Sequence, residues 1–392
     1  MQETWRWFGP DDNITLKHIA QAGATGIVTS LHHIATGDEW PLADVKQRKA
    51  IIEASGLEWS VIESIPLHND IKTRTGDYQR YLENYKRSIE NVGAAGVKTV
   101  CYNFMPVVDW TRTNLNYRLN NASSALRFEM TDFAAYDVYI LERSGAVNDY
   151  SPAVLEKAKV RLHNMNQEER DLLEKNIIAG LPGGEGSYTR DSIRSVIQQF
   201  IDLGTEGFRE NLFAFLREII PVAEKAGVKM CIHPDDPPFS LFGLPRVVST
   251  AEDARALLAA APSLYNGLTL CAGSFGARGD NNLVEIAREF GSNIHFVHLR
   301  NVIREEDGSF YEADHLAGDN DMVGLVAALL KEERSRDASG RQDVQIPMRP
   351  DHGHLLTDEE GRPGNKPGYS YIGRLKGLAE LRGVIHALDK VL

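Results

Sequence analysis

Short runs of β-branched and aromatic residues alternate along the chain with longer stretches whose apolar residues recur at helical spacing. The stretches "NITLKHIAQAG", "DVKQRKAIIEASG" and "YQRYLENYKRSIENVGAAG" each end in glycine just before the next run, which is the usual signal for a helix end. A repeated strand–helix order predicts a parallel sheet. The predicted strands occupy the runs 4–9, 25–31, 57–65, 97–104, 228–234, 268–274, 294–302 and 344–351.

Eight strand–helix units in one chain favour an α/β fold of the TIM (β/α)8 barrel type over an open doubly wound sheet. The amphipathic stretch 371–392 supplies a closing helix. No GxGxxG motif follows the first run, which argues against a dinucleotide-binding sheet. We therefore expect residues 1–392 to form a single barrel domain.

The stretch from Met105 to about Arg209 interrupts this alternation and contains no convincing strand. It holds helical patterns and a glycine-rich loop, "LPGGEGSYTR". A segment this long within a compact domain is usually functional or disordered. Because it follows the fourth strand, it emerges at the C-terminal face of the barrel. We predict a helical cap insertion at about 107–207 that lies over the barrel mouth.

The composition is that of a globular protein, with 42% hydrophobic and 25% charged residues among 392. A net charge of −12 without any block of Lys and Arg argues against nucleic-acid binding. No apolar run is long enough for a membrane helix, and the N-terminus lacks the pattern of a signal peptide. Three cysteines, an odd number, do not make a disulfide framework, so we expect a cytoplasmic protein with reduced thiols.

The C-terminal ends of four successive predicted strands carry residues that can bind a metal. These residues are His233, Cys271, His298 and Asp351, on the fifth to eighth runs. Each alone is commonly structural: a core histidine, a buried cysteine or a helix-capping aspartate. Because barrel active sites lie at the C-terminal strand ends, four such residues at one rim favour a metal site. Two nitrogens, one sulfur and one oxygen suit a divalent transition metal with positions open for substrate.

Three further residues of the same types are expected to be structural. Cys101 lies in the middle of a strand, and Cys231 lies one pleat below His233. His295 is three residues before His298, so it faces away from the barrel lumen. We assign all three to core packing.

The motif "MRPDHGH" concentrates polar side chains where the eighth strand gives way to a loop. Arg349 carries a planar guanidinium that can bind both oxygens of a carboxylate. His354 lies just outside the predicted ligands and could shuttle a proton. Tyr369 follows on a Pro-Gly turn and could act as an acid or base, whereas Tyr371 begins the last helix and is the better packing residue. The alternative for the motif is a solvated loop with a capping aspartate.

Side chains at the other strand ends could hydrogen-bond a polyhydroxylated substrate beneath the cap. We take Trp7, Asn103, Arg349 and His352 as candidate substrate contacts. Glu63, Ser64, His32 and His33 also lie at predicted strand ends.

Several motifs together resemble D-mannonate dehydratase of the hexuronate pathway, the UxuA type, over essentially the whole length. They are "WRWFGPDD", "CIHPDDPP", "LTLCAGSFG", "HFVHLRN", "RPDHGH" and "PGYSYIGRLKGL". The resemblance implies a xylose-isomerase-like TIM barrel, dependence on Mn²⁺ or Fe²⁺, and dehydration of D-mannonate to 2-keto-3-deoxy-D-gluconate. Carried onto matching positions, it implies the same four metal ligands and makes Arg349, His354 and Tyr369 catalytic candidates. We expect a sugar acid as substrate, no nucleic-acid or membrane partner, and a homo-oligomer.

Two alternatives to this interpretation remain open. A metal-dependent sugar isomerase or epimerase could use the same fold, although such sites typically hold several carboxylates and two metals. A non-catalytic protein with a structural zinc site is the second, since four ligands could close the coordination sphere. Incubation with Mn²⁺ and a panel of aldonates discriminates between mannonate dehydration and these two alternatives.

Overall fold

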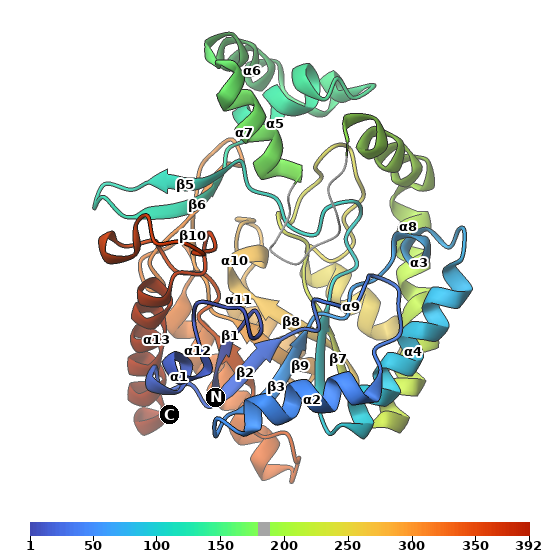
Figure 1. The fold of residues 1–392 in the computed structure, drawn as a ribbon, viewed down its shortest axis with the longest axis vertical. Coiled ribbons are helices and arrows are strands. Elements are labelled where there is room, and N and C mark those ends of the chain that lie inside the picture. The colour runs from blue at the N-terminus through green and yellow to red at the C-terminus, as the bar shows by residue number, and fades with distance from the viewer. Residues whose placement is uncertain (179–188) are drawn as a thin grey trace.

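The computed structural model describes residues 1–178 and 189–392 (Figure 1). Its centre is a closed barrel of eight parallel strands in the order β1-β12-β9-β8-β7-β4-β3-β2. Each predicted run overlaps one of these strands, so the predicted TIM barrel is confirmed. The barrel strands are β1 (Gln2–Arg6), β2 (Gly26–Thr29), β3 (Glu58–Glu63), β4 (Thr99–Tyr102), β7 (Lys229–Ile232), β8 (Asn266–Cys271), β9 (Ile294–His298) and β12 (Pro347–Arg349).

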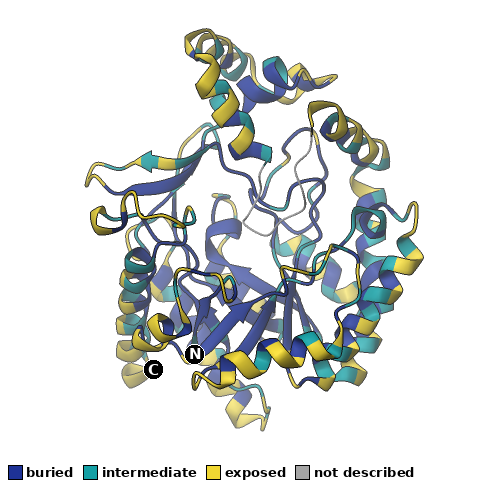
Figure 2. Ribbon diagram, in the orientation of Figure 1, coloured by how far each residue is buried: buried dark blue, intermediate teal, exposed yellow. Residues whose placement is uncertain are grey.

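Helices surround the barrel and turn their apolar faces toward the strands, which Figure 2 shows as buried. In α4 (Tyr78–Ala94), the buried residues Leu82, Tyr85, Ile89 and Val92 recur at spacings of three and four, as an amphipathic helix requires. No helix in the described part of the chain has the length and apolar content needed to cross a bilayer. The other helices outside the insertion are α1 (Leu16–Gln21), α2 (Leu42–Glu53), α3 (Asn69–Thr73), α9 (Ala251–Ala260), α10 (Ala272–Phe275), α11 (Leu283–Phe290), α12 (Met322–Ala338) and α13 (Tyr371–Val391).

A long insertion, residues 103–204, separates β4 from the helix that packs behind it. The helix α8 (Arg190–Ala226) breaks at Gly204, whose φ of 68° is readily adopted only by glycine. The first part of α8 belongs to the insertion, together with α5 (Met130–Ala135), α6 (Pro152–Asn164) and α7 (Gln167–Ile178). Figure 1 shows α5, α6 and α7 standing beyond the barrel, on the side where the insertion leaves it.

The insertion also contains two strands, so the prediction that this stretch has none is wrong. β5 (Asn114–Arg118) and β6 (Ser124–Phe128) form an antiparallel hairpin. β6 in turn pairs with β11 (Phe310–Glu312), which pairs with β10 (Val302–Arg304) in a four-stranded sheet. β11 comes from the segment after β9, so this pairing joins the insertion to a part of the chain far away in sequence.

A layer of apolar side chains fills the barrel just below its mouth. It consists of Val28, Val61, Cys101, Cys231 and Phe296, each from a different strand. The two cysteines lie side by side in the β4–β7 register and are buried, which confirms their predicted packing role. Because side chains two residues apart share a face, the next inward layer toward the C-terminal ends is polar.

Candidate active site

Three of the predicted ligands gather at the C-terminal ends of adjacent strands. Cys271 and His298 are the last residues of β8 and β9 and are paired in register. His233 directly follows β7. One donor atom from each of the three lies within 4.8 Å of the others. The Nδ1 atom of His233 lies 2.7 Å from the carbonyl oxygen of Pro234, to which it donates, so its Nε2 is free for a ligand.

Asp351, the fourth predicted ligand, lies beside this cluster. Its Oδ2 is 3.9 Å from the Sγ of Cys271 and 3.9 Å from the Nδ1 of His298. Asp351 has a φ of 68°, a left-handed conformation that aspartate tolerates better than most residues. The structure thus brings His233, Cys271 and His298 together and places Asp351 beside two of them; we call these four residues the ligand cluster.

The environment of the ligand cluster suits a cation. His298 is buried, and neither of its ring nitrogens has a hydrogen-bond partner among the described residues. The nearest carboxylate oxygen, Oε1 of Glu63, lies 3.3 Å from its Nε2 without hydrogen-bond alignment. A buried polar group without a partner costs about 1–3 kcal/mol, and coordination of a metal would remove that cost.

The charge state of the cluster points the same way. Burial by itself raises the pKa of the Cys271 thiol, but Arg300 and His233 outweigh burial and hold the pKa well below its usual range. Burial lowers the pKa of His233, yet its interaction with Cys271 raises that pKa to about 10. The surroundings therefore favour a thiolate, the metal-binding form, and a metal bound to that thiolate would replace the proton that His233 otherwise carries.

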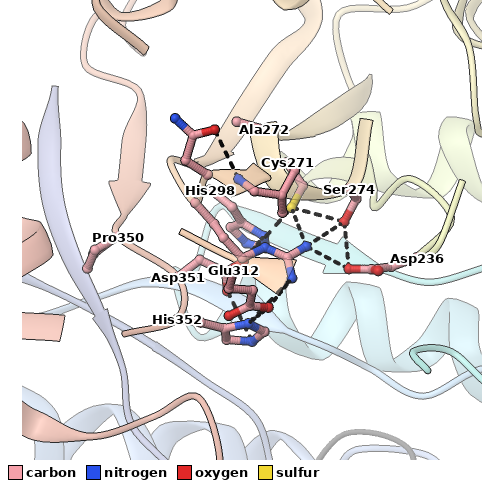
Figure 3. A network of polar contacts seen from close by, with 12 residues as sticks. Asp236, Cys271, Ala272, Ser274, His298, Glu312, Pro350, Asp351 and His352 are labelled. Atoms are coloured by element: carbon pink, nitrogen blue, oxygen red, sulfur yellow. Dashed lines mark hydrogen bonds and ion pairs between the residues drawn. The ribbon is translucent and has the colours of Figure 1, made fainter. Parts of the chain in front are cut away.

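A buried polar network that includes Asp236 and Glu312 lies beside the ligand cluster (Figure 3). Arg300 joins these two carboxylates, and the sequence analysis did not single it out. Arg300 donates to Oδ2 of Asp236 at 2.6 Å and to Oε1 of Glu312 at 2.7 Å. Its Nε lies 3.1 Å from Oδ2 of Asp351. The sequence does contain a signal for Arg300, because Arg300 lies two residues after His298 and side chains two apart in a strand share a face.

A second arginine, Arg112 of the insertion, joins this network. Its Nη1 donates to Oδ1 of Asp236 at 2.7 Å, and its Nη2 lies 3.5 Å from Oε1 of Glu312. Burial raises the pKa of Asp236, but Arg112 and Arg300 outweigh it and hold the pKa far below its usual range. In the same way, His352 and the two arginines lower the pKa of Glu312 to about 2 against burial.

Arg349 and Glu63 form a third group at the edge of the ligand cluster. The buried guanidinium of Arg349 donates to Oε1 of Glu63 at 2.9 Å and to Asp351. Burial raises the pKa of Glu63, but Arg349 outweighs it and lowers the pKa well below its usual range. Arg349 therefore adjoins the ligand cluster, as predicted, with two carboxylates already beside it.

The candidate proton-transfer residues are placed differently from one another. His352 donates from Nδ1 to Oε1 of Glu312 at 2.7 Å, and its ring meets that of Tyr369 edge-on at 4.9 Å. Burial raises the pKa of Tyr369 to about 12. His354 donates from Nε2 to the carbonyl oxygen of Glu312 at 2.9 Å, and its Nδ1 lies 3.3 Å from Oδ1 of Asp314. Both nitrogens of His354 thus face oxygen acceptors.

The structure does not bring Trp7 to the mouth. Trp7 is 3% exposed, lies in the main hydrophobic core, and its ring faces the guanidinium of Arg48. Strand alternation turns the preceding residue, Arg6, inward instead, where it contacts Glu63. Asn103 follows β4, and its amide donates to Asp109 at 3.3 Å.

Comparisons with known proteins show the family of the chain. A family model described as D-mannonate dehydratase (UxuA) matches residues 1–392. Mannonate dehydratase from Saccharophagus degradans is 75% identical over 99% of this chain and 98% of its own length. Mannonate dehydratase 2 from Agrobacterium fabrum is 56% identical over 100% of this chain and 98% of its own length.

Solved structures give the same result. Mannonate dehydratase from Streptococcus suis serotype 2 is 34% identical with a TM-score of 0.79, covering 100% of this chain and 94% of that one. D-allulose 3-epimerase from Methylomonas sp. is 11% identical with a TM-score of 0.50, covering 98% and 97%, and shares the fold alone. Because the family model matches the whole chain and the similar relatives align over nearly all of it, the chain belongs to the D-mannonate dehydratase (UxuA) family.

Proposed function

We propose that the chain removes water from D-mannonate to give 2-dehydro-3-deoxy-D-gluconate in the breakdown of hexuronates such as glucuronate. The proposal depends above all on the ligand cluster, which occurs at the strand ends of a barrel whose family carries this activity. The reaction breaks the C2–H bond and the bond from C3 to its hydroxyl, and the enol that results becomes the 2-keto group.

We propose His233, Cys271, His298 and Asp351 as the residues that hold one Mn²⁺ or Fe²⁺ ion. Their nitrogen, sulfur and oxygen donors suit a divalent transition metal. When bound there, such an ion stabilises the negative charge that builds on the substrate carboxylate as the C2 proton leaves. Arg349 is proposed to add a second positive contact to that carboxylate, because it is buried beside the ligand cluster.

We propose His352 as the base that removes the C2 proton. Its Nδ1 is engaged by Glu312, which fixes the tautomer and leaves the Nε2 lone pair free. Nε2 lies 3.7 Å from Oδ1 of Asp351, so it faces the ligand cluster. His354, which the sequence offered with Tyr369 for the base and acid roles without deciding between them, faces acceptors with both nitrogens and is the alternative that kinetic comparison tests.

Tyr369 is proposed as the acid that protonates the departing 3-hydroxyl. With a pKa of about 12, the phenol keeps its proton at neutral pH and has one to give. Its edge-on contact with His352 places the two proton-transfer groups next to each other. Asn103 is retained as a proposed substrate contact, whereas Trp7 is not, because it packs in the core.

We infer that the insertion acts as a cap and forms one domain with the barrel. Arg112 supports this inference, because it belongs to the insertion and its guanidinium binds Asp236 and Glu312 beside the ligand cluster. Asn176 in α7 also donates to the carbonyl oxygen of Thr113, which holds the helices of the insertion to the same segment. A cytoplasmic location is consistent with three free cysteines, and the homo-oligomer stays a prediction that analytical ultracentrifugation can test.

The decisive experiment is incubation of the purified protein with Mn²⁺ and each of several aldonates. We expect a 2-keto-3-deoxy product from D-mannonate and little from its epimers. Ketoses and aldoses serve as the control for isomerase or epimerase chemistry. Conversion of a neutral sugar without release of a keto-deoxy acid from D-mannonate would overturn the proposal.

A further inference from the structure

Two adjacent histidines after β2 differ in their surroundings. Nε2 of His33 lies 3.0 Å from Oδ2 of Asp44 and is thereby engaged at the protein surface. The ring of His32 makes no hydrogen bond or ion pair with any residue in 1–178 or 189–392. The side chain of His32 is exposed to solvent, although other protein atoms lie around its ring. Its polar atoms are therefore available to a ligand.

The neighbour of His32 is Phe8, which lies two residues after Arg6, the last residue of β1. The two rings are stacked with centroids 6.2 Å apart. Two cations lie over the Phe8 ring, Arg6 at 5.2 Å and Lys366 at 4.8 Å. Phe8 is only partly buried, so this group of aromatic and cationic side chains borders an accessible space.

Tyr369 connects this group to the reacting end of the active site. One side of its ring meets Phe8 edge-on at 4.9 Å, and another meets His352 edge-on at 4.9 Å. The contacts therefore run outward in order from His352 through Tyr369 and Phe8 to His32. A substrate with its first carbons at the ligand cluster, and with its chain along this row of contacts, would bring its far carbons toward Phe8 and His32.

We propose that His32, on the Phe8 wall, binds the terminal hydroxyls of the six-carbon acid and thereby selects the length of the substrate. This inference deepens the proposed function and depends on it. It assigns a specificity-determining role to a residue that touches neither the ligand cluster nor the carbons that react.

The chemistry of the group suits hydroxyls. Burial and the charge of Arg6 lower the pKa of His32 to about 3, so the imidazole is neutral at physiological pH. A neutral imidazole offers one donor and one acceptor, which is what a sugar hydroxyl needs. The ring of Phe8 gives the carbon backbone an apolar surface, and Lys366 adds a donor at the rim.

The test compares D-mannonate with D-lyxonate, the five-carbon acid that keeps the configuration at C2 to C4. We expect His32→Ala to lower kcat/KM about tenfold for D-mannonate, the value of one lost hydrogen bond, and less than about twofold for D-lyxonate. His32→Gln, which keeps a donor and an acceptor, should recover part of the loss. Where turnover of D-lyxonate is too slow, its inhibition constant against D-mannonate gives the same comparison.

His33→Ala is the matched control and should leave both substrates unaffected. Equal losses on the two acids in His32→Ala, or no loss on either, would overturn the inference. Absence of D-mannonate turnover in the wild-type protein would instead refute the proposed function. Calorimetry then compares the affinities of the two acids for the metal-loaded wild-type protein and for His32→Ala. This comparison tests the contact between His32 and the terminal hydroxyls separately from catalysis.

Discussion

Replacement of Arg300 by methionine tests the buried network directly. Methionine fills similar space but removes the charge that Asp236, Glu312 and Asp351 share. Removal of one partner from a buried ion pair costs about 3–5 kcal/mol, because the remaining charge is left buried.

The pKa of Glu312 gives an independent magnitude. It falls from 4.5 to about 2, and at about 1.36 kcal/mol per unit this equals about 3 kcal/mol, shared among His352, Arg300 and Arg112. Since Arg300 also serves two further carboxylates, we expect Arg300→Met to lower the free energy of unfolding by about 3 kcal/mol. A protein of ordinary stability still folds after such a loss.

The sign of the pH dependence follows from the same shift. A carboxyl whose pKa is lowered in the folded state stabilises the protein above its unfolded pKa of about 4.5 and loses this effect as the pH falls toward 2. The difference in the free energy of unfolding between wild type and Arg300→Met should therefore have its largest value at pH 7 and decrease as the pH falls below about 4.5.

The assay is urea unfolding of the metal-free protein, followed by tryptophan fluorescence at several pH values. Arg334→Met is the control, because Arg334 forms an exposed ion pair with Asp389 and such pairs contribute little. The reasoning requires a loss of about 3 kcal/mol, because the substitution leaves buried carboxylates unpaired. It would be refuted if the free energy of unfolding of Arg300→Met lay within about 1 kcal/mol of the wild-type value at pH 7.

Three further outcomes follow from the ligand cluster and its neighbours. Cys271→Ser should weaken metal binding and shift preference toward harder ions, and unchanged metal content by elemental analysis would contradict the assignment. Tyr369→Phe and His352→Ala should lower kcat by about 10²–10⁴-fold with normal metal content, and His354→Ala should lower it much less. The reverse ranking of the two histidine variants would assign the base to His354. In deuterated water, the variant that still exchanges the C2 proton but forms no product has lost the acid. Chelation should abolish turnover and lower the thermal midpoint, with recovery of both on adding Mn²⁺, and a chelated protein that keeps its midpoint would contradict binding to the folded state.

The sequence predicted the barrel well because its eight strands are local hydrophobic runs with clear ends. The four proposed ligands followed from the same runs, since each lies at a strand end where the barrel architecture fixes its neighbours. The β5–β6 hairpin was missed because β6 pairs with β11 across the chain, and its own pattern is weak. Trp7 packs in the core against Arg48, and one position of strand phase decides whether a side chain faces the lumen or the outer core.

The Arg300 network was missed for a different reason. Arg300 itself lies on the predicted inward face, but its partners come from a loop and from the short strand β11, and no periodicity in the sequence predicts where these two segments lie. Asp236 follows a strand end, and Glu312 belongs to β11. Only folded geometry shows that both carboxylates converge on one guanidinium.

The contact that Arg112 makes has a consequence for how such a chain can be assembled. Its acceptors Asp236 and Glu312 lie 124 and 200 residues later in the chain, so the first half is synthesised long before its counter-charges exist. Contacts of this separation slow folding, because a large loop must close before they form. A fragment that ends after the insertion would bear an unpaired arginine in its interior. We therefore expect the two halves of this barrel to be unable to fold as independent pieces, and circular permutants opened between them to refold slowly.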